Sequence, residues 1–252
     1  MAGRRRPELG QHYLRPSVAR RLVDLSAVGA QDFVIEIGPG RGALTDPLAE
    51  RVGRLLALEV DPMLAARLAE RYRARDHVEV VEADVLAYRW PRGHFSVVSN
   101  IPYGATAEIM RRLLAAAPRE AWLVVQREAA VRYAGRPWGL ETVQSLRLKA
   151  AWHVEVRGYP RRVDFDPPPA VESAVLHLAR RDRPLADAGF PRFIEGVFGR
   201  AETVGRCLRP YVTHTQLRRL STGLGFAPSA RPTTLTFDQW LAVYRFACGG
   251  LL

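Results

Sequence analysis

The stretch Asn100-Ile-Pro-Tyr103 has the residue types needed to recognise the amino group of a nucleobase. It follows Val97-Val98, whose β-branched side chains predict the end of a buried strand. The side-chain carbonyl of Asn100 and a nearby backbone carbonyl could accept both hydrogens of an exocyclic amino group. Tyr103 offers an aromatic ring on which the base could stack. The alternative is an ordinary strand-to-helix turn, because Asn-x-Pro is common in turns.

A glycine-rich stretch upstream supports a nucleotide site. Residues 32–37 form an apolar run that leads into Gly38-Pro-Gly40-Arg-Gly42, and residues 43–51 have a helical pattern. A strand, a glycine loop and a helix make the first unit of a nucleotide-binding α/β fold, in which the glycines let the backbone approach a ligand closely. The spacing is GxGxG rather than the GxGxxG of dinucleotide enzymes, and a lone glycine loop can also be a tight turn.

Acidic residues end the next two predicted strands. Glu59 ends the strand predicted over residues 54–59, about 20 residues past the glycines, where a ribose-binding carboxylate is expected. Asp84 ends the strand predicted over residues 78–84 and could accept from an adenine amino group or cap a turn; we favour adenine. Because parallel strands bind ligands at their carboxyl ends, Glu59, Asp84 and Asn100 are expected to share one site.

The elements that must position these residues continue along the chain. Helices are predicted over residues 17–25, 62–74, 106–117, 127–135 and 141–151, and strands over 95–99, 121–126, 152–156 and 174–178. The loop between the last two strands contains Phe165-Asp-Pro-Pro-Pro169. We expect the prolines to display Phe165 for stacking on a base rather than bury it in the core.

Residues 180–184 are the expected linker to a small second domain. Four helical patterns follow, over residues 190–198, 200–208, 215–220 and 236–246, without a cluster of catalytic side chains. We therefore expect an α/β domain over residues 1–180 and a small helical domain over residues 181–252.

The composition favours a partner that is a polyanion. The chain of 252 residues has a formal charge of +11, and Lys149 is the only lysine among its 37 basic residues, so the rest are arginine. The planar arginine fork suits phosphates, and nucleic acid is the first candidate partner. Coding bias toward arginine would explain the ratio of arginine to lysine but not the net charge.

Other classes of protein are disfavoured. Cys207 and Cys248 form no CxxC pair, so neither a metal site nor a disulfide framework is expected. No apolar run approaches the roughly 20 residues of a membrane span, and the N-terminal arginines are not followed by the hydrophobic stretch of a signal peptide. The chain is expected to be cytoplasmic.

These motifs together resemble the rRNA adenine N6-methyltransferases, and specifically the erythromycin-resistance (Erm) methyltransferases, over essentially the whole chain. The resemblance rests on Gly10-Gln-His-Tyr-Leu14, Glu36-Ile-Gly-Pro-Gly-Arg-Gly42, Glu59-Val-Asp61, Asp84, Asn100-Ile-Pro-Tyr103, Phe165-Asp-Pro-Pro-Pro169 with Val171-Glu-Ser173, and the helical tail. Two positions depart from the family pattern: His12, where Asn is usual, and Gly104, where Asn is frequent.

The resemblance implies a Rossmann-like, S-adenosylmethionine-dependent methyltransferase domain with a small C-terminal helical domain that binds RNA. It implies N6-methylation of an adenine in the peptidyl-transferase loop of 23S rRNA, which gives resistance to macrolide, lincosamide and streptogramin B antibiotics. The implied substrate is free or partly assembled large-subunit rRNA, and the implied enzyme is a monomer.

The resemblance also implies a role for each matching residue. Cofactor contacts are expected from Gln11, His12 and Leu14 at the methionine end, from Gly38 and Gly40 in the loop, from Glu59 at the ribose, from Val60 and Asp84 at the adenine, and from Asn100. Asn100 would also orient the target amino group and free its lone pair, while Tyr103 and Phe165 would sandwich the flipped base. Neither a metal nor a strong general base is expected.

Three alternative classes of protein share part of this pattern. The 16S rRNA adenine dimethyltransferases of small-subunit assembly usually have Asn-Leu-Pro-Tyr, whereas residue 101 is Ile here, and the tail Asp238-Gln-Trp-Leu-Ala-Val-Tyr244 looks more similar to the Erm type. Non-enzymatic relatives, such as the methyltransferase-like mitochondrial transcription factors, are disfavoured by the intact acidic and Asn-Ile-Pro-Tyr motifs. A DNA adenine methyltransferase would need a target-recognition domain, which the sequence does not show.

Overall fold

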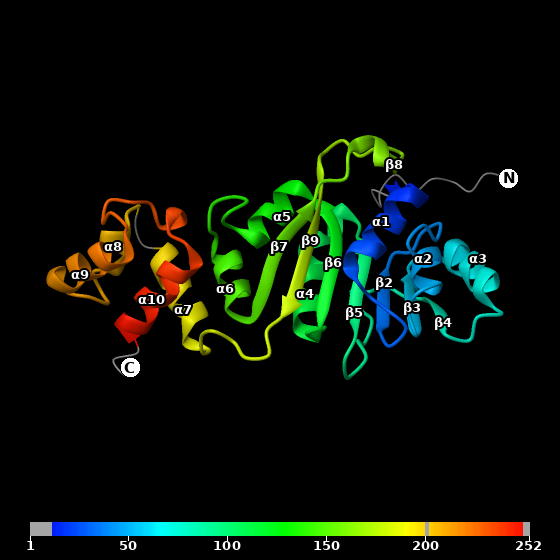
Figure 1. The fold of residues 1–252 in the computed structure, drawn as a ribbon, viewed down its shortest axis with the longest axis horizontal. Coiled ribbons are helices and arrows are strands. Elements are labelled where there is room, and N and C mark those ends of the chain that lie inside the picture. The colour runs from blue at the N-terminus through cyan, green and yellow to red at the C-terminus, as the bar shows by residue number, and fades with distance from the viewer. Residues whose placement is uncertain (1–11, 200–201, 249–252) are drawn as a thin grey trace. The chain divides into compact units, whose positions relative to one another are not determined.

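The computed structural model describes residues 12–199 and 202–248, which fall in two compact units (Figure 1). The first unit comprises Met1–Ala130 and Glu155–Arg180, and the second comprises Val131–Val154 and Arg181–Leu252. In this division a border falls at residue 180, where the sequence predicts one, whereas residues 131–154 lie with the second unit rather than with the first. They join the second unit because Leu146 and Ala150 pack in its hydrophobic core.

A seven-stranded sheet positions the site. Its strands, in spatial order, are β4 (Val78–Glu82), β3 (Arg54–Glu59), β2 (Phe33–Ile37), β5 (Ser96–Asn100), β6 (Glu120–Gln126), β9 (Ser173–Arg180) and β7 (Trp152–Gly158). The strands from β4 to β6 pair in parallel, and β9 pairs antiparallel with β6. In β2, β3, β5 and β6 nearly every residue is buried, as expected for strands covered on both faces.

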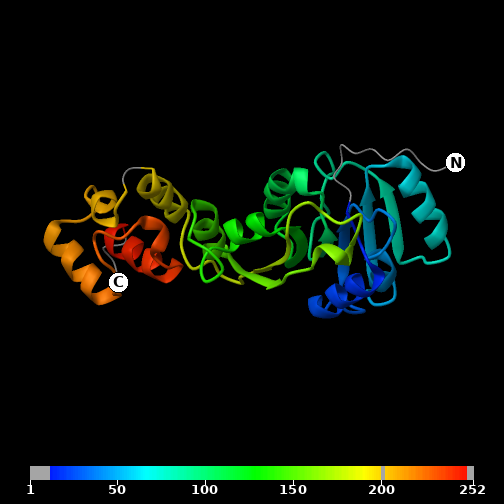
Figure 2. The same ribbon diagram turned by 90° about the horizontal axis from the view of Figure 1, so that it is seen from above.

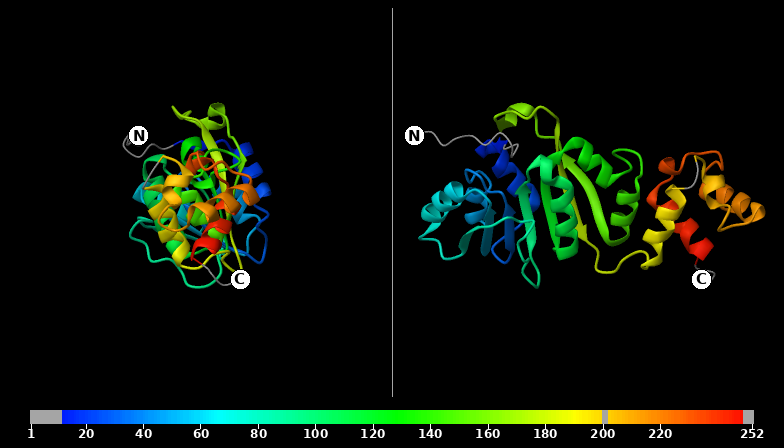
Figure 3. Two further views of the ribbon diagram at one scale, coloured as in Figure 1. Left: turned by 90° about the vertical axis from the view of Figure 1, so that its left-hand side faces the viewer. Right: turned by 180° about the vertical axis from the view of Figure 1, so that it is seen from behind.

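Helices cover both faces of this sheet. They are α1 (Pro16–Ser26), α2 (Thr45–Ala49), α3 (Pro62–Tyr72), α4 (Thr106–Ala116) and α5 (Arg127–Ala134). Helix α1 lies in front of the sheet in Figure 1, and α4 lies on the opposite face, toward the viewer in the right-hand view of Figure 3. Within the described residues, no helix is both long enough and apolar enough to cross a bilayer.

A short ribbon that the sequence did not predict lies beside the sheet. Strand β1 (Tyr13–Leu14) pairs antiparallel with β8 (Phe165–Asp166), with Leu14 opposite Phe165. Two 3-10 turns flank the site: η2 (Tyr103–Ala105) follows β5, and η3 (Arg162–Asp164) precedes β8. The ribbon joins segments about 150 residues apart in sequence.

The second unit is helical. It contains α6 (Val143–Ala151), α7 (Gly189–Phe198), α8 (Val204–Leu208), α9 (His214–Leu224), η4 (Pro232–Thr234) and α10 (Phe237–Cys248), drawn from green to red in Figure 2. Its core combines aliphatic and aromatic side chains: Phe190, Phe193 and Trp240 are buried together, and the ring centroids of Phe193 and Trp240 lie 6.4 Å apart.

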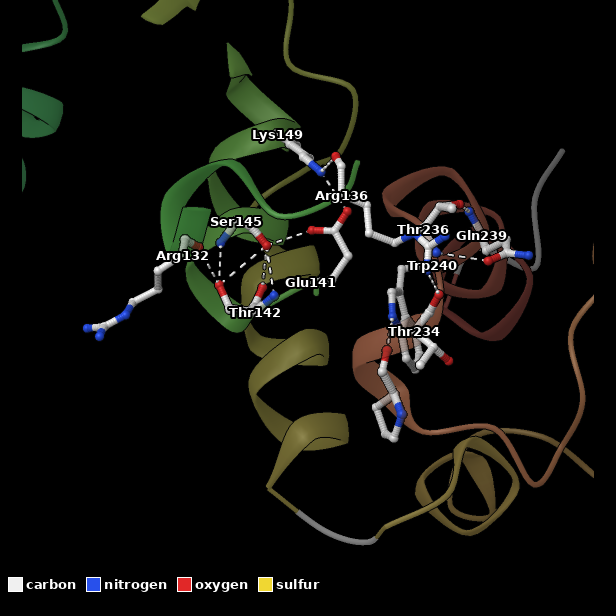
Figure 4. Close-up of polar contacts among 11 residues, drawn as sticks. Arg132, Arg136, Glu141, Thr142, Ser145, Lys149, Thr234, Thr236, Gln239 and Trp240 are labelled. Atoms are coloured by element: carbon white, nitrogen blue, oxygen red, sulfur yellow. Dashed lines mark hydrogen bonds and ion pairs between the residues drawn. The ribbon is translucent and has the colours of Figure 1, made fainter. Parts of the chain in front are cut away.

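A largely buried ion pair joins the last turn of α6 to the segment that precedes this helix. Lys149 Nζ lies 2.5 Å from Glu141 Oε1 and also donates to the backbone carbonyl of Arg136 at 2.9 Å. Ser145 Oγ donates to the other carboxylate oxygen of Glu141 at 2.6 Å, so each oxygen of this carboxylate accepts a hydrogen bond (Figure 4). Arg136 in turn donates to the carbonyl of Thr234, which joins this loop to η4.

Candidate functional site

A cavity lies where β2, β3 and β5 end, at the edge of the sheet where the sequence predicts a site. It is lined by His12, Tyr13, Gly38, Gly40, Glu59, Val60, Asn100, Ile101, Pro102 and Tyr103. The structure thus brings together seven of the predicted residues: His12, Gly38, Gly40, Glu59, Val60, Asn100 and Tyr103.

The carboxylate of Glu59 binds the backbone of the glycine loop. Gly40 N donates to Glu59 Oε2, and Asp61 N donates to Oε1, both at 2.9 Å. Gly40 has a φ of +57°, and a Cβ there would lie 2.5 Å from the ring of Tyr13, so no other residue fits. Each oxygen of Glu59 keeps a lone pair that can accept from a hydroxyl, which suits a ribose diol.

A second carboxyl group, Glu36, precedes this loop; it begins the quoted Glu36-Ile-Gly-Pro-Gly-Arg-Gly42 motif, but sequence reasoning assigned it no role. The pKa of Glu36 is raised to about 8, chiefly by burial; the hydrogen bond from Thr45 opposes this rise, and the neighbouring carboxylates Glu59 and Asp46 add to it. Thr45 Oγ1 donates to Glu36 Oε2 at 2.7 Å. The signal in the sequence is a lone acid inside the apolar strand β2.

Asn100 presents an unpaired acceptor. Its Nδ2 donates to the backbone carbonyl of His12 at 2.6 Å, which fixes which end of the amide faces that carbonyl. Its Oδ1 is buried and has no hydrogen-bond partner among the described residues. Because a buried acceptor left unpaired costs about 1–3 kcal/mol, this oxygen suits a ligand that donates an N–H.

Tyr103 is held by a residue that sequence reasoning did not single out. The hydroxyls of Tyr103 and Ser173 lie 2.6 Å apart, and Ser173 belongs to the quoted Val171-Glu-Ser173 motif. Burial raises the pKa of Tyr103, so its phenol stays neutral. The ring of His12 lies 5.7 Å from that of Tyr103, and His12 Nδ1 donates to the carbonyl of Pro167.

Phe165 does not have the predicted exposure. Its side chain is 0% exposed and packs in the core with Leu14, so the expectation that it is displayed rather than buried is wrong, while stacking on a base stays a prediction. The physical reason is the β1–β8 pairing, which turns Phe165 toward the core although prolines follow it.

The other predicted cofactor residues differ in their positions. Leu14 is buried and does not line the cavity described above, although it lines a small neighbouring cavity with Gly38 and Asn100. Asp84 is exposed, and its Oδ1 caps a turn by accepting from Leu86 N at 2.8 Å; a contact with adenine stays a prediction. Gln11 lies outside the described residues. None of the described residues form a cluster suited to a metal ion.

The chain is similar to known proteins over almost its whole length. The family model described as "Ribosomal RNA adenine dimethylase" matches residues 2–247. The "Ribosomal RNA small subunit methyltransferase A" of Rubrobacter xylanophilus is 35% identical, over 96% of this chain and 95% of the relative. The "rRNA adenine N-6-methyltransferase" of Aeromicrobium erythreum is 33% identical, over 98% of this chain and 74% of the relative. The crystal structure of 23S rRNA methyltransferase ErmE has a TM-score of 0.87 at 28% identity, over 93% of this chain and 99% of ErmE.

Proposed function

The chain belongs to the ribosomal RNA adenine dimethylase family, and from that premise we propose that it methylates N6 of an adenine in small-subunit rRNA. At the level of the family, the expected fold, enzyme class and cofactor are confirmed: a Rossmann-like, S-adenosylmethionine-dependent rRNA adenine N6-methyltransferase. The single observation on which the chemistry rests is the buried, unpaired Oδ1 of Asn100 at the carboxyl end of β5.

The residues of the cavity fit both the cofactor and the target. S-adenosylmethionine supplies the methyl group as an electrophilic sulfonium. Each carboxylate oxygen of Glu59 has a lone pair that can accept from a ribose hydroxyl. Position 40 has no room for a side chain, because Gly40 lies close to the ring of Tyr13. Val60 is half exposed beside Glu59 and offers an apolar face for an adenine ring.

Asn100 and Tyr103 act on the target base. Asn100 Oδ1 accepts one hydrogen of the target amino group and so turns its nitrogen lone pair out of conjugation with the ring. The ring of Tyr103 stacks on the base, and the hydrogen bond to Ser173 fixes its orientation. The amine loses its proton after it is methylated, so the step needs positioning more than a strong base.

The choice of small-subunit rRNA is supported by the names of the relatives. The proteins of Rubrobacter xylanophilus, Acidobacterium capsulatum and Bordetella pertussis, at 34–38% identity, are all small subunit methyltransferases A. These names favour the 16S alternative over the Erm type, which Ile101 and the C-terminal tail had favoured from sequence.

A second candidate target is 23S rRNA, with antibiotic resistance as its consequence. The observation that favours it is the match to ErmE over 99% of that chain, with a TM-score of 0.87. At 28% identity the likeness extends through both units of this protein, since it covers 93% of the chain.

Methyl transfer to separate RNA substrates tests both candidates. Purified protein with labelled cofactor is given either immature small subunits or protein-free 23S rRNA, and the modified adenine is located by reverse transcription. The Asn100→Ala variant is the control for contaminating activity. Label on 16S rRNA alone supports the first candidate. Label on 23S rRNA alone, with macrolide protection in cells, overturns it in favour of the second, and no label on either overturns both.

A further inference from the structure

A second cavity of about 470 Å³ lies in the first unit, between α1 and the chain that links β7 to β8. Its floor consists of buried aliphatic side chains: Leu14, Val18, Leu22, Val124 and Val175. Its rim carries the exposed guanidinium groups of Arg21, Arg157 and Arg161. The target site described above does not include these residues.

The charge of the rim favours an anionic occupant. Arg157 Nε pairs with Glu155 at 2.7 Å, and Arg161 lies 3.4 Å from Asp164, but Arg21 has no ion pair among the described residues. Asp164 is the only carboxylate of the lining, and its Oδ2 already accepts from the backbone N–H of Arg161. Arginine groups held around an opening bind phosphate oxygens through paired N–H donors.

The rest of the lining favours a base attached to that phosphate. Tyr159 is 51% exposed at the cavity, and the guanidinium of Arg127 lies 5.4 Å from its ring centroid. Leu25, at the end of α1, is 44% exposed at the same opening. A phosphate alone gains nothing from an aliphatic floor, whereas an unstacked base gains both apolar burial and stacking on an aromatic ring.

The position of the cavity relates it to the target site. Tyr13 lines the target cavity and Leu14 lines the second cavity, and these are the two residues of β1. Successive side chains of a strand point to opposite faces, so β1 separates the two cavities. The other wall is fixed to β1, because Arg15 N donates to the carbonyl of Asp164 and Arg15 Nε donates to that of Val163.

We propose that this second cavity binds an unpaired nucleotide of the substrate rRNA that neighbours the target adenine. Its base lies on the aliphatic floor against Tyr159, and its phosphate lies on Arg21, Arg157 and Arg161. The inference rests on the proposed rRNA methylation, but not on which ribosomal subunit supplies the RNA.

Adjacent arginines of α1 provide a matched test. Arg20 and Arg21 are both exposed, but Arg20 pairs with Glu50 at 3.1 Å and does not line this cavity. Affinity is measured for the rRNA fragment that contains the methylated adenine. Arg21→Ala is expected to weaken binding about tenfold and to reduce the slope of log affinity against log salt by about 0.7, the value for one phosphate contact on a single strand. Arg20→Ala removes the same charge and is expected to change affinity less than about twofold.

Substitutions of Tyr159 provide a second test of the same proposal. Tyr159→Ala is expected to weaken RNA binding between about fivefold and hundredfold, and Tyr159→Phe, which keeps the ring, is expected to match the wild type. Equal losses for Arg20→Ala and Arg21→Ala, or wild-type affinity for Tyr159→Ala, would overturn the inference. Unchanged melting temperature and unchanged affinity for S-adenosylhomocysteine establish that the variants are folded.

The two proposals fail in different ways. If the wild type methylates rRNA but Arg21→Ala and Tyr159→Ala bind RNA as tightly as their control variants, only the second-cavity inference is overturned. A wild-type protein that binds the rRNA and shows the variant pattern but transfers no methyl group sinks only the proposed function. A wild-type protein with no affinity for the rRNA sinks both.

Discussion

Replacing Glu36 by Gln should change how the stability of the protein depends on pH. Glu36 is 2% exposed inside β2, and burial raises its pKa to about 8 from the ordinary value of 4.5. The folded chain therefore holds the Glu36 proton up to about pH 8, while the unfolded chain releases it near pH 4.5. The contribution of protonated Glu36 to the stability of the folded protein is fully present below pH 4.5 and is lost as the pH rises to about 8.

The size of the effect follows from the two pKa values. Each pH unit between them costs the folded state about 1.36 kcal/mol, so ionisation in the unfolded chain removes about 2 kcal/mol at pH 6 and about 4 kcal/mol at pH 8. Gln keeps the shape of the protonated carboxyl group and an oxygen that can accept from Thr45, but it does not titrate. Relative to wild type, Glu36→Gln should gain about 2 kcal/mol between pH 6 and pH 8.

Urea unfolding of both proteins at several pH values measures this difference. Glu79→Gln is the matched control, because Glu79 is exposed on β4 and pairs with Arg54 at the surface. Only the Glu36 variant should show a stability difference that widens with pH. Parallel curves for wild type and Glu36→Gln would mean that Glu36 is ionised in the folded protein, and the argument from burial would be refuted.

Substitutions at four other residues have expected outcomes. Asn100→Ala should slow single-turnover methylation at saturating cofactor by about 10²–10³-fold, because the target amino group loses its acceptor; wild-type activity would rule out that role. Tyr103→Phe should keep most of this activity, whereas Tyr103→Ala should lose at least about tenfold, and an inactive Phe variant would point to the hydroxyl as the chemical group. Glu59→Ala should weaken S-adenosylhomocysteine by about 1–3 kcal/mol in calorimetry, and unchanged affinity would mean that Glu59 does not reach the ribose. Lys149→Met should lower the free energy of unfolding in urea by about 3–5 kcal/mol, because Glu141 is left buried and unpaired; a near-neutral result would contradict the ion-pair argument.

Local sequence patterns predicted the parts of the site that depend on local structure. Glu59 and Asn100 end parallel strands, and strand ends can be located from apolar runs alone. Gly40 could be located too, because its conformation is a local requirement. The boundaries of α1 and α3 also fell within a few residues of those expected, since their apolar stripes are regular.

Long-range pairing accounts for what could not be predicted. Phe165 was expected to be exposed because prolines follow it, but pairing with Leu14, about 150 residues away, decides its burial. The hydrogen bond from Asn100 Nδ2 to the carbonyl of His12 also joins distant parts of the chain, since His12 directly precedes β1. No local sequence pattern could predict it. Residues 131–154 resembled a continuation of the first domain, because their helical pattern does not say which core it faces.

The burial of Lys149 has a practical consequence for chemical modification. Lys149 carries the only side-chain amine in the sequence, and its side chain is 12% exposed and bonded to Glu141. Acylating reagents therefore reach Lys149 poorly in the folded protein, so crosslinking or dye attachment at this lysine should be slow under native conditions. Because the sequence has no other lysine, the rate at which Lys149 is acylated measures how often its ion pair with Glu141 opens.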